Sequence, residues 1–506
     1  MKIGLEVHQR LDTREKLFCS CPTRGGFVKT CELVRVLNPS VGETGEFDKA
    51  ALFEKKKGRA SVYNVFEDSS CLVECDEEPP KKLNDEALEI AVLICRLLNA
   101  EVVDEIHVMR KTVIDGSAVS GFQRTAIVGL NGKVETSEGS VLIPTVCLEE
   151  ESAGIKGDRF NIDRLGIPLV EIATDSESIK TPVQAMETAL KIGELLRSTE
   201  RVQRGIGTIR QDLNVSISGG ARVEIKGVQE LKLIPKIIEK EVERQERLLK
   251  FKSAGLSFKW SSNEIIVEGL SGEALKEVKD YCRVLGVDFD GRRVRGGEEA
   301  LSFIKWRLEF FSKGVPEETR KVEGVETSYM RPLPGGGRMY PETDCLPVNS
   351  EGFVERVKSV KVVSFEERLK DYERMGLNKE LSRKMLNSNY RLFEKVAREG
   401  VDPVFAATVI VETVKSLERR GLKVSDERLE EFFELYKRGV FSRNASEKVL
   451  ELEAESGGLE SAVKKAGLEK FSKQKIREIA SQNSFEEAMR KYRLNVEAKE
   501  LREFYK

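Results

Sequence analysis

Short segments in the first half of the chain alternate apolar with polar residues, as strands do when they bury one face. In residues 3–8 the apolar side chains point one way, while Glu6 and His8 share the opposite face of the predicted strand. Carboxylates stand among apolar residues in four further segments, which are residues 146–151, 169–173, 212–217 and 222–226. If these strands pair in one sheet, one face forms the core and the other gathers carboxylates around an imidazole.

Such a gathering of carboxylates needs a compensating cation, because like charges on one sheet repel and raise one another's pKa. Carboxylate oxygens together with an imidazole suit Mg²⁺ or Mn²⁺. The alternative is that each strand turns a polar face to water, as antiparallel strands often do. Five such strands, one of them carrying one of the chain's two histidines, favour a metal-assisted site.

The succession of elements predicts an α+β fold of several domains. Strands and glycine-marked hairpins prevail up to about residue 250, where Thr181 and Pro182 are typical of the start of a helix. A smaller unit with a strand near residues 265–267 follows, and the chain beyond residue 355 is helical. We expect a large mixed-sheet domain of residues 1–250 plus 316–354, a small inserted α/β domain of residues 251–315, a helical domain of residues 355–435 and a helical tail domain of residues 436–506.

Opposite charges balance along the chain. There are 84 Lys and Arg residues against 86 Asp and Glu, so any site for a polyanion has to be local. The basic helices after residue 355 are either plain scaffold or a surface that grips RNA phosphates. The N-terminus opens with a strand instead of an apolar signal, and no apolar run approaches the roughly 20 residues that span a bilayer. We therefore expect a cytoplasmic protein with no membrane contact.

The nine cysteines are odd in number and scattered, which predicts reduced thiols rather than a disulfide framework. Cys19 and Cys21, followed by Cys31, are similar to part of a zinc knuckle, but the second half of that motif is incomplete. Cys71 or Cys75 is a candidate fourth ligand. Free buried thiols are the alternative interpretation, which the sequence alone favours over zinc.

Long motifs in the first 230 residues resemble the GatB/GatE family, which supplies the kinase and transamidase component of tRNA-dependent amidotransferases. They are IGLEVH at residues 3–8, LEE at 148–150, DRLGIPLVEI at 163–172, GIGTIRQDLNVSI at 205–217 and VEIKGVQ at 223–229. The archaeal GatE branch of that family is the part most similar to residues 71–80, 109–117, 121–125 and 331–344. The resemblance implies that the mixed-sheet domain is a catalytic cradle.

By this resemblance, the substrate is glutamate misacylated onto glutamine tRNA. The family phosphorylates the glutamyl carboxylate with ATP and lets ammonia displace the phosphate, which gives glutaminyl-tRNA. ATP is needed because a carboxylate is a poor electrophile, and Mg²⁺ neutralises charge as the phosphoryl group moves. The residues that match the family's pattern are His8, Glu150 and Glu171 as metal ligands, and Glu6, Asp212 and Glu224 as further acidic residues of the same pocket.

Four cationic residues are candidate ligands for the phosphates of ATP. Charge and position on the predicted strands select Arg210 and Lys226. Arg331 and Arg338 flank the three glycines at residues 335–337, whose backbone N–H groups can approach an anion closely. The loop lacks the Lys-Ser/Thr of a Walker motif, and a rigid surface turn is the alternative.

The sequence shows no glutaminase site, because it has no Gly-Gly-Ser-Ser amidase stretch and neither histidine accompanies a credible cysteine nucleophile. The resemblance implies that ammonia comes from an asparaginase-type partner, GatD, in a dimer of GatD–GatE heterodimers that binds glutamine tRNA. Three departures from the family stand out: an insertion reduced to about 60 residues, Glu151 in place of the usual aspartate, and the missing basic, glycine-containing final segment.

Two other functions compete with this interpretation. One is a non-catalytic scaffold that binds tRNA and presents it to a partner enzyme. The other is an ATP-dependent carboxylate–amine ligase that acts on a free small molecule. A scaffold has no need for the six acidic and imidazole residues named above, and a small-molecule ligase has no need for the long helical end.

Overall fold

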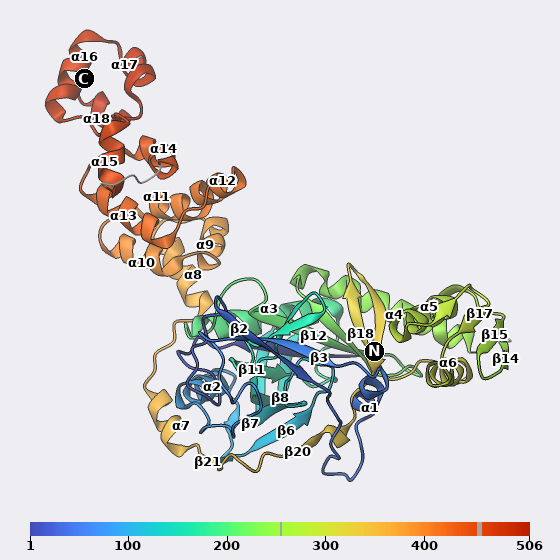
Figure 1. Cartoon of the computed structure of the whole chain (residues 1–506). Helices are drawn as coiled ribbons and strands as arrows, with labels where there is room; N and C mark the ends of the chain where they lie inside the picture. The colour runs from blue at the N-terminus through green and yellow to red at the C-terminus, as the bar shows by residue number, and fades with distance from the viewer. Residues whose placement is uncertain (253–255, 453–457, 506) are drawn as a thin grey trace. The chain divides into compact units, whose positions relative to one another are not determined.

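The computed structural model describes residues 1–252, 256–452 and 458–505, which belong to two compact units (Figure 1). The first unit comprises residues 1–362 and holds every β-strand that the structure describes, and the second begins at residue 363 and is built from helices. The α+β fold class predicted from the sequence is confirmed, with a large mixed sheet, small sheets and a helical C-terminal region.

An 11-stranded sheet is the central element of the first unit. Its strands follow the order β19-β18-β13-β12-β1-β11-β8-β7-β6-β20, and β4 pairs with β7 outside this path. The sheet is mixed because β13 and β18 run parallel, whereas neighbours such as β1 and β12 are antiparallel. The strands are β1 (Lys2–Arg10), β4 (Glu101–Val102), β6 (Val108–Thr112), β7 (Phe122–Thr136), β8 (Gly139–Glu150), β11 (Pro168–Ala173), β12 (Ile209–Ser216), β13 (Val223–Val228), β18 (Glu318–Glu323), β19 (Glu326–Pro332) and β20 (Met339–Pro341).

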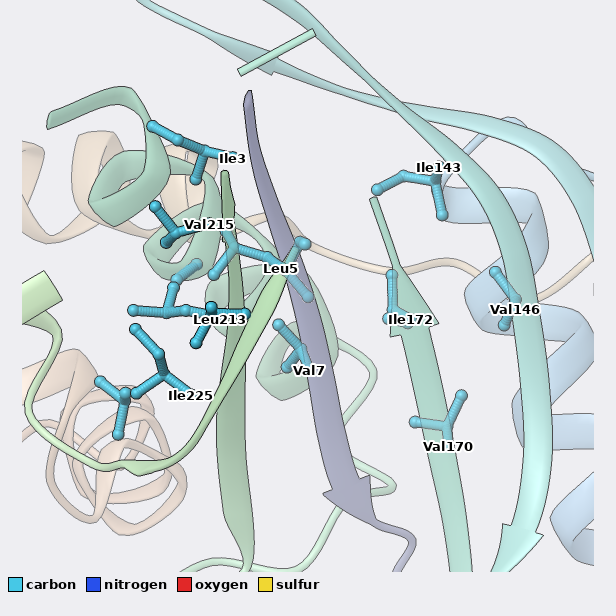
Figure 2. Close-up of a cluster of buried hydrophobic side chains, with 14 of the residues drawn as sticks. Ile3, Leu5, Val7, Ile143, Val146, Val170, Ile172, Leu213, Val215 and Ile225 are labelled. Atoms are coloured by element: carbon cyan, nitrogen blue, oxygen red, sulfur yellow. The ribbon is translucent and has the colours of Figure 1, made fainter. Parts of the chain in front are cut away.

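One face of this sheet is apolar and buried. Ile3, Leu5 and Val7 of β1 are fully buried and lie among the apolar side chains of the neighbouring strands (Figure 2). Helices α2, α3 and α4 pack against these strands and belong to the same core. The other helices of this unit are short or belong to the insertion. The bounds outside the insertion are α1 (Lys49–Lys56), α2 (Asp85–Leu97), α3 (Pro182–Ser198), α4 (Ile234–Phe251) and α7 (Glu351–Lys358).

Local sequence signals explain where two of these elements begin or turn. The hydroxyl of Thr181 accepts a hydrogen bond from the backbone N–H of Gln184, and Pro182 occupies the first turn of α3, so the predicted helix start is confirmed. The β7–β8 hairpin closes at Gly139, whose φ of +117° is a conformation that L side chains rarely adopt. Glycine is therefore the residue that this turn requires.

Two small sheets complete the part of the first unit outside the insertion. A four-stranded sheet has the order β2-β3-β10-β9, and a two-stranded sheet pairs β21 with β5. Their bounds are β2 (Lys29–Arg35), β3 (Ser61–Phe66), β5 (Glu105–Ile106), β9 (Gly154–Lys156), β10 (Arg159–Asn161) and β21 (Val348–Asn349).

The insertion is a four-stranded sheet with two helices. The sheet has the order β14-β15-β17-β16, and α5 packs against both α6 and α4. The bounds are β14 (Ser257–Trp260), β15 (Glu264–Glu268), α5 (Gly272–Leu285), β16 (Asp288–Phe289), β17 (Arg293–Arg295) and α6 (Glu298–Phe310). Its apolar side chains are continuous with the core of the large sheet.

A buried network of charges lies where the insertion meets the large sheet. Glu277 of α5 accepts hydrogen bonds from Arg307 of α6 at 2.5 Å and from Arg320 of β18 at 3.1 Å, and it also pairs with Arg244 of α4. Arg320 bonds in addition to Glu318 at 2.6 Å. These side chains are at most 3% exposed, so each charge depends on its partners for the compensation that water would otherwise give.

The second unit consists of short helices around two apolar clusters, the larger of which includes Phe393, Phe432 and Phe441. Its helices are α8 (Phe365–Arg374), α9 (Lys379–Leu386), α10 (Tyr390–Arg398), α11 (Pro403–Thr408), α12 (Val414–Arg419), α13 (Asp426–Lys437), α14 (Ser446–Glu451), α15 (Gly458–Lys465), α16 (Lys473–Gln482), α17 (Phe485–Tyr492) and α18 (Ala498–Arg502). Among the residues that the structure describes in either unit, no helix combines the length and apolar character needed to cross a bilayer.

The charge network predicts a large loss of stability when Glu277 is neutralised. Glu277→Gln leaves three buried guanidinium groups short of negative charge, which should lower the free energy of unfolding by about 3–5 kcal/mol. Urea denaturation followed by circular dichroism measures this change. The matched control is Glu268→Gln, which removes an ion pair with Arg292 that is more than half exposed and should leave the midpoint almost unchanged. Equal losses of unfolding free energy in Glu277→Gln and Glu268→Gln would contradict the stabilising role of Glu277 in the buried network.

The same network predicts a specific pH dependence. Burial by itself raises the pKa of Glu277, but three guanidinium groups outweigh it and hold the pKa at about 2. A carboxyl whose pKa is lower in the folded than in the unfolded chain contributes stability above its unfolded pKa of about 4.3, and that contribution is lost as the pH falls toward 2. The difference in unfolding free energy between wild type and Glu277→Gln should therefore shrink between about pH 5 and pH 2. If urea denaturation gives the same difference in unfolding free energy between wild type and Glu277→Gln at pH 5 and at pH 2, this prediction is refuted.

Candidate active site

A cavity of about 340 Å³ opens on the polar side of the large sheet. Eight carboxylates and five Lys and Arg side chains line it, so negative charge is in excess. All ten residues predicted from the sequence as site or cofactor-binding residues lie in its wall: Glu6, His8, Glu150, Glu171, Arg210, Asp212, Glu224, Lys226, Arg331 and Arg338.

The position of β1 between two antiparallel partners brings the predicted residues together. His8 lies opposite Glu171 of β11 on one side and opposite Arg210 of β12 on the other, and Glu6 lies opposite Asp212 of β12. Directly paired residues project from the same face of a sheet. Because the intervening residues of β1 are buried in the core, the polar residues are left to face the cavity.

The first cluster in the cavity consists of His8, Glu149 and Glu171, whose candidate ligand atoms all lie within 4.8 Å of one another. The Nε2 atom of His8 is 3.1 Å from Glu171 Oε2. Lys111 of β6 donates to Glu149 Oε1 at 2.5 Å, and its Nζ atom lies 3.6 Å from Glu171. Although burial lowers the pKa of His8, the hydrogen bond and the charge of Glu171 outweigh that effect and raise it. The cluster can therefore hold a cation or a proton.

Glu150, which the family resemblance places among the metal ligands, does not belong to this cluster. Its carboxylate accepts hydrogen bonds from the backbone N–H of Arg124 at 2.9 Å and from the Arg124 guanidinium at 3.3 Å. Glu149 lies opposite Leu169, which is on the same face of β11 as Glu171, whereas the Glu150 carboxylate is turned to Arg124 although it also lines the cavity. The structure thus puts Glu149 where the sequence-based set has Glu150.

Sequence reasoning missed Glu149 and Lys111, and a signal for the first was present. In the segment 146–149, Val146 and Leu148 are fully buried, so Cys147 and Glu149 have to share the polar face with Glu171. The apolar alternation that identified Glu6 and His8 would have selected Glu149 as well. Lys111 lies on β6, whose sequence gives no comparable signal.

The second cluster consists of Glu6, Asp212 and Glu224, again with candidate ligand atoms within 4.8 Å of one another. Lys226 bridges two of its members, with Nζ 2.8 Å from a carboxylate oxygen of both Asp212 and Glu224. Thr319 of β18 donates to Glu224 at 2.7 Å. Three carboxylates thus converge on one point with a single ammonium group between two of them.

Two carboxyls of the second cluster, Glu6 and Glu224, have pKa values shifted in opposite directions by their surroundings. Burial raises the pKa of Glu6, and the charges of Glu171 and Glu224 raise it further. Burial also tends to raise the pKa of Glu224, but Lys226 outweighs it and the pKa falls to about 2. Glu6 consequently has a stronger tendency than Glu224 to take up a proton.

The four predicted phosphate ligands are held in different ways. Arg210 donates to Glu151 at 2.7 Å, and Arg331 lies 3.2 Å from Asp115. Arg331 also lowers the pKa of Glu224, and Arg338 lowers that of Glu171, and both residues line the cavity. The cavity therefore has fixed cations around its acidic floor.

The glycines between Arg331 and Arg338 are not among the residues that line the cavity. They allow the backbone of residues 335–337 to approach that of residues 42–48 closely. A Cβ added at Gly42 would lie 1.8 Å from the carbonyl oxygen of Gly337. The backbone N–H of Gly335 donates to Asp48 at 2.7 Å. The loop is thus tied to residues 42–48, while the arginines on either side of it reach the cavity.

The donor sets fit a hard divalent cation. Two groups of carboxylates, one with an imidazole, sit in a cavity with excess negative charge, and oxygen donors of this kind bind Mg²⁺ or Mn²⁺. His8, Glu149 and Glu171 are the residues suited to one ion, and Glu6, Asp212 and Glu224 to a second.

Comparison with known proteins agrees with this geometry. A family model described as the GatB/GatE catalytic domain matches residues 1–354, and one described as the GatB domain matches residues 391–497. The first match alone covers more than half of the chain and contains the whole cavity. The chain belongs to the GatB/GatE family.

Several archaeal relatives are named as the E subunit of glutamyl-tRNA(Gln) amidotransferase. The Methanocaldococcus jannaschii protein is 37% identical over 95% of this chain and 90% of its own length. The Sulfurisphaera tokodaii protein is 40% identical over 92% of this chain and 89% of its own length. The Thermococcus gammatolerans protein is 39% identical over 95% of this chain and 90% of its own length. The first alignment extends over 578 residues, more than the 506 of this chain, so that relative contains residues that this chain lacks.

The geometry predicts that Glu149 contributes more to cation binding than Glu150. Glu149→Gln should weaken Mn²⁺ binding by roughly 10–100-fold, since a charged candidate ligand is lost, whereas Glu150→Gln should have a smaller effect because Arg124 holds that carboxylate. Electron paramagnetic resonance of Mn²⁺ titrated into the purified chain measures both affinities. A larger loss with Glu150→Gln would restore the set predicted from the sequence.

Proposed function

We propose that this chain is the kinase and transamidase component of a tRNA-dependent amidotransferase that converts Glu-tRNA(Gln) to Gln-tRNA(Gln). The observation that supports it most is the cavity on the large sheet, where two carboxylate clusters stand among fixed cations within the GatB/GatE catalytic domain. The names of the archaeal relatives supply the substrate class.

In this proposal the two clusters divide the work of holding charge. His8, Glu149 and Glu171 hold one Mg²⁺, and the cluster of Glu6, Asp212 and Glu224 provides a second acidic site. Bound Mg²⁺ supplies the positive charge that offsets the phosphates of ATP during transfer. Glu150 has an indirect role, because Arg124 holds its carboxylate at the edge of the cavity.

The cations of the cavity wall orient the nucleotide. Arg331 near the end of β19 and Arg338 beyond it both line the cavity, which places them to bind phosphate oxygens. Lys226 stays between Asp212 and Glu224, and Arg210 is anchored by Glu151. Arg210, Lys226 and Arg331 are already held by carboxylates, so little ordering of these side chains is needed when ATP arrives.

The reaction then proceeds in two steps. An oxygen of the glutamyl carboxylate attacks the γ-phosphorus of ATP, the bond to the bridging oxygen breaks, and ADP leaves. Ammonia next attacks the acyl carbon, the C–O bond breaks, and inorganic phosphate leaves with its electron pair. A carboxylate has to remove the proton that ammonium carries, and Glu6 is suited to this because its raised pKa makes it a stronger base than Glu224.

Ammonia in this scheme comes from a partner. His8 hydrogen-bonds to Glu171, and the exposed His107 lies near Glu105, so both imidazoles have carboxylate neighbours rather than the thiol that a Cys–His glutaminase needs. We infer an asparaginase-type glutaminase, GatD, in a dimer of GatD–GatE heterodimers. The helical second unit, which contains the match to the GatB domain, is the candidate surface for glutamine tRNA.

A direct assay tests the proposal. The purified chain alone, with Glu-tRNA(Gln), ATP, Mg²⁺ and ammonium chloride, should form Gln-tRNA(Gln) and ADP. Glu149→Gln should reduce the rate by on the order of 100–1,000-fold, because charge stabilisation at the phosphoryl group is lost. Binding of tRNA in a filter assay should stay within about twofold of wild type, because phosphate contacts outside the cavity provide that affinity.

The matched control is Glu135→Gln, which alters an exposed carboxylate of β7 that pairs with Lys133 and should keep full activity. If wild type forms no product and no ADP while tRNA still binds, the assay is repeated with GatD. Product only in that mixture would mean that the partner completes the site, and continued absence of product would favour the scaffold over the enzyme.

A further inference from the structure

The polar face of the large sheet continues past the acidic clusters toward the end of β1. Arg10 follows His8 by two positions on this strand, so alternation places it on the same face as Glu6 and His8. On the neighbouring strand β12, Arg210 lies opposite His8. The charge along these two strands therefore changes from the carboxylates of the second cluster to a pair of guanidinium groups.

One buried carboxylate fixes both guanidinium groups. The side chain of Glu151 has no exposed surface, and its two oxygens accept hydrogen bonds from Arg10 Nε at 2.8 Å and from Arg210 Nη2 at 2.7 Å. The backbone N–H of Ser152 donates to the same carboxylate at 2.9 Å. Glu151, which stands where the family usually has aspartate, is thus the residue that holds the two cations side by side.

The pair keeps one positive charge in excess. Among the residues that the structure describes, Glu151 is the only carboxylate within ion-pair distance of either guanidinium. Each guanidinium has several N–H donors and gives one of them to Glu151. The side chains of Arg210 and Arg10 are 34% and 14% exposed, so other donors can reach a ligand. A single positive charge with unused donors suits one phosphodiester group.

A short loop that closes on the backbone of Arg10 presents an apolar side chain. The backbone N–H of Arg10 donates to the carbonyl of Thr208 at 2.9 Å, and the carbonyl of Arg10 accepts from the N–H of Gln203 at 3.0 Å. Between these two points Ile206 is 100% exposed, the highest fraction among the large apolar residues that the structure describes. Both of its neighbours are glycines with positive φ, which lets the chain turn sharply there.

Cations beside an exposed apolar side chain are suited to a single-stranded nucleotide, because the phosphate meets the cations and the base covers the apolar group. In an aminoacyl-tRNA the glutamyl group is esterified to the 3′-terminal ribose, so the terminal nucleotide has to lie next to the cavity when the carboxylate reacts inside it. ATP is a poorer match for this pair, since its several phosphate charges need the acidic clusters and their cations.

We propose that Arg10, Arg210 and Ile206 form the site for the unpaired 3′-terminal nucleotide of the aminoacylated tRNA. The inference rests on the proposed function and names positioning residues for its substrate. The two guanidinium groups bind the phosphate that precedes the terminal nucleoside, and Ile206 packs against its base. This assigns Arg210 to an RNA phosphate and leaves the phosphates of ATP to Arg331 and Arg338.

Binding of two unacylated tRNA(Gln) transcripts to the purified full chain tests the proposal. One transcript ends in CCA and the other lacks the terminal adenosine and its phosphate. Wild type should bind the complete transcript about tenfold more tightly, because one phosphate and one base are contacted. Arg10→Gln and Ile206→Ser should each lower this ratio to about threefold or less. A wild-type ratio near one, or a ratio that either variant leaves unchanged, would overturn the proposal.

Two matched substitutions away from the site should keep the wild-type ratio. Arg292→Gln removes a guanidinium of the insertion that is 64% exposed, and Leu142→Ser removes an exposed apolar side chain near the start of β8, whereas Glu151 follows its end. The fully exposed Ile206 contributes little to folding, so the result for Ile206→Ser does not depend on a loss of stability. An equal fall of the ratio in either control would contradict the assignment.

Calorimetry with a non-hydrolysable ATP analogue and Mg²⁺ separates RNA from ATP as the source of the phosphate. The affinity of Arg10→Gln and Ile206→Ser for the analogue should stay within about twofold of wild type, because the pair lies outside the ATP site of this proposal. Loss of analogue affinity with an unchanged transcript ratio would assign the pair to ATP and refute the RNA site.

These measurements also separate the terminal-nucleotide site from the proposed function, since neither requires turnover. Formation of Gln-tRNA(Gln) by a wild-type chain whose transcript ratio is near one would refute the site alone. Absence of amidation, with and without the partner, from a chain that shows the expected ratio and its loss in both variants would refute the proposed function and keep the RNA-binding site.

Discussion

The pairing of β1 with β11 on one side and β12 on the other is the constraint on which the candidate site depends. Ile3, Leu5 and Val7 are fully buried, so the opposite face of β1 is fixed as well. A slip of one residue would turn every side chain of the strand to the other face, which would bury Glu6 and His8 in the core. Burial of the apolar face of β1 thus fixes the positions of the polar side chains on its opposite face. The carboxylates converge there without needing any attraction among themselves.

Charge compensation is the second requirement, because the carboxylates gathered on one face of the sheet repel one another. Lys226 lies between Asp212 and Glu224, and Lys111 lies between Glu149 and Glu171. Each cluster therefore contains one ammonium group, from β13 in one case and from β6 in the other. A carboxylate excess remains after this pairing, and it makes the cavity suited to divalent cations and to the phosphates that accompany them.

Much of this arrangement follows from the sequence, and the exceptions have physical reasons. Alternation of apolar and polar residues predicts which side chains face the cavity, and capping residues such as Thr181 predict a helix start, because both signals are local. Glu149 was missed because a pair of glutamates was taken from a family resemblance without asking which of them shares a face with Glu171. The sequence leaves open whether Cys71 or Cys75 joins Cys19 and Cys21, because the choice depends on how two distant turns fold together, and the structure brings Cys71 next to them, with the exposed Cys31 outside the group. The buried network around Glu277 is hidden for the same reason.

That network has an evolutionary consequence for the length of the insertion. The charges of Arg244 and Arg320 belong to the large sheet and its helix, while Glu277 and Arg307 come from the insertion. A chain that deleted α5 would remove Glu277 from both guanidinium groups and leave them only Glu241 and Glu318 in the core, whereas the outer strands β14 to β17 have no part in this pairing. Shortening the insertion should therefore cost less stability at its outer strands than at α5, which completes a charge network shared with the large sheet.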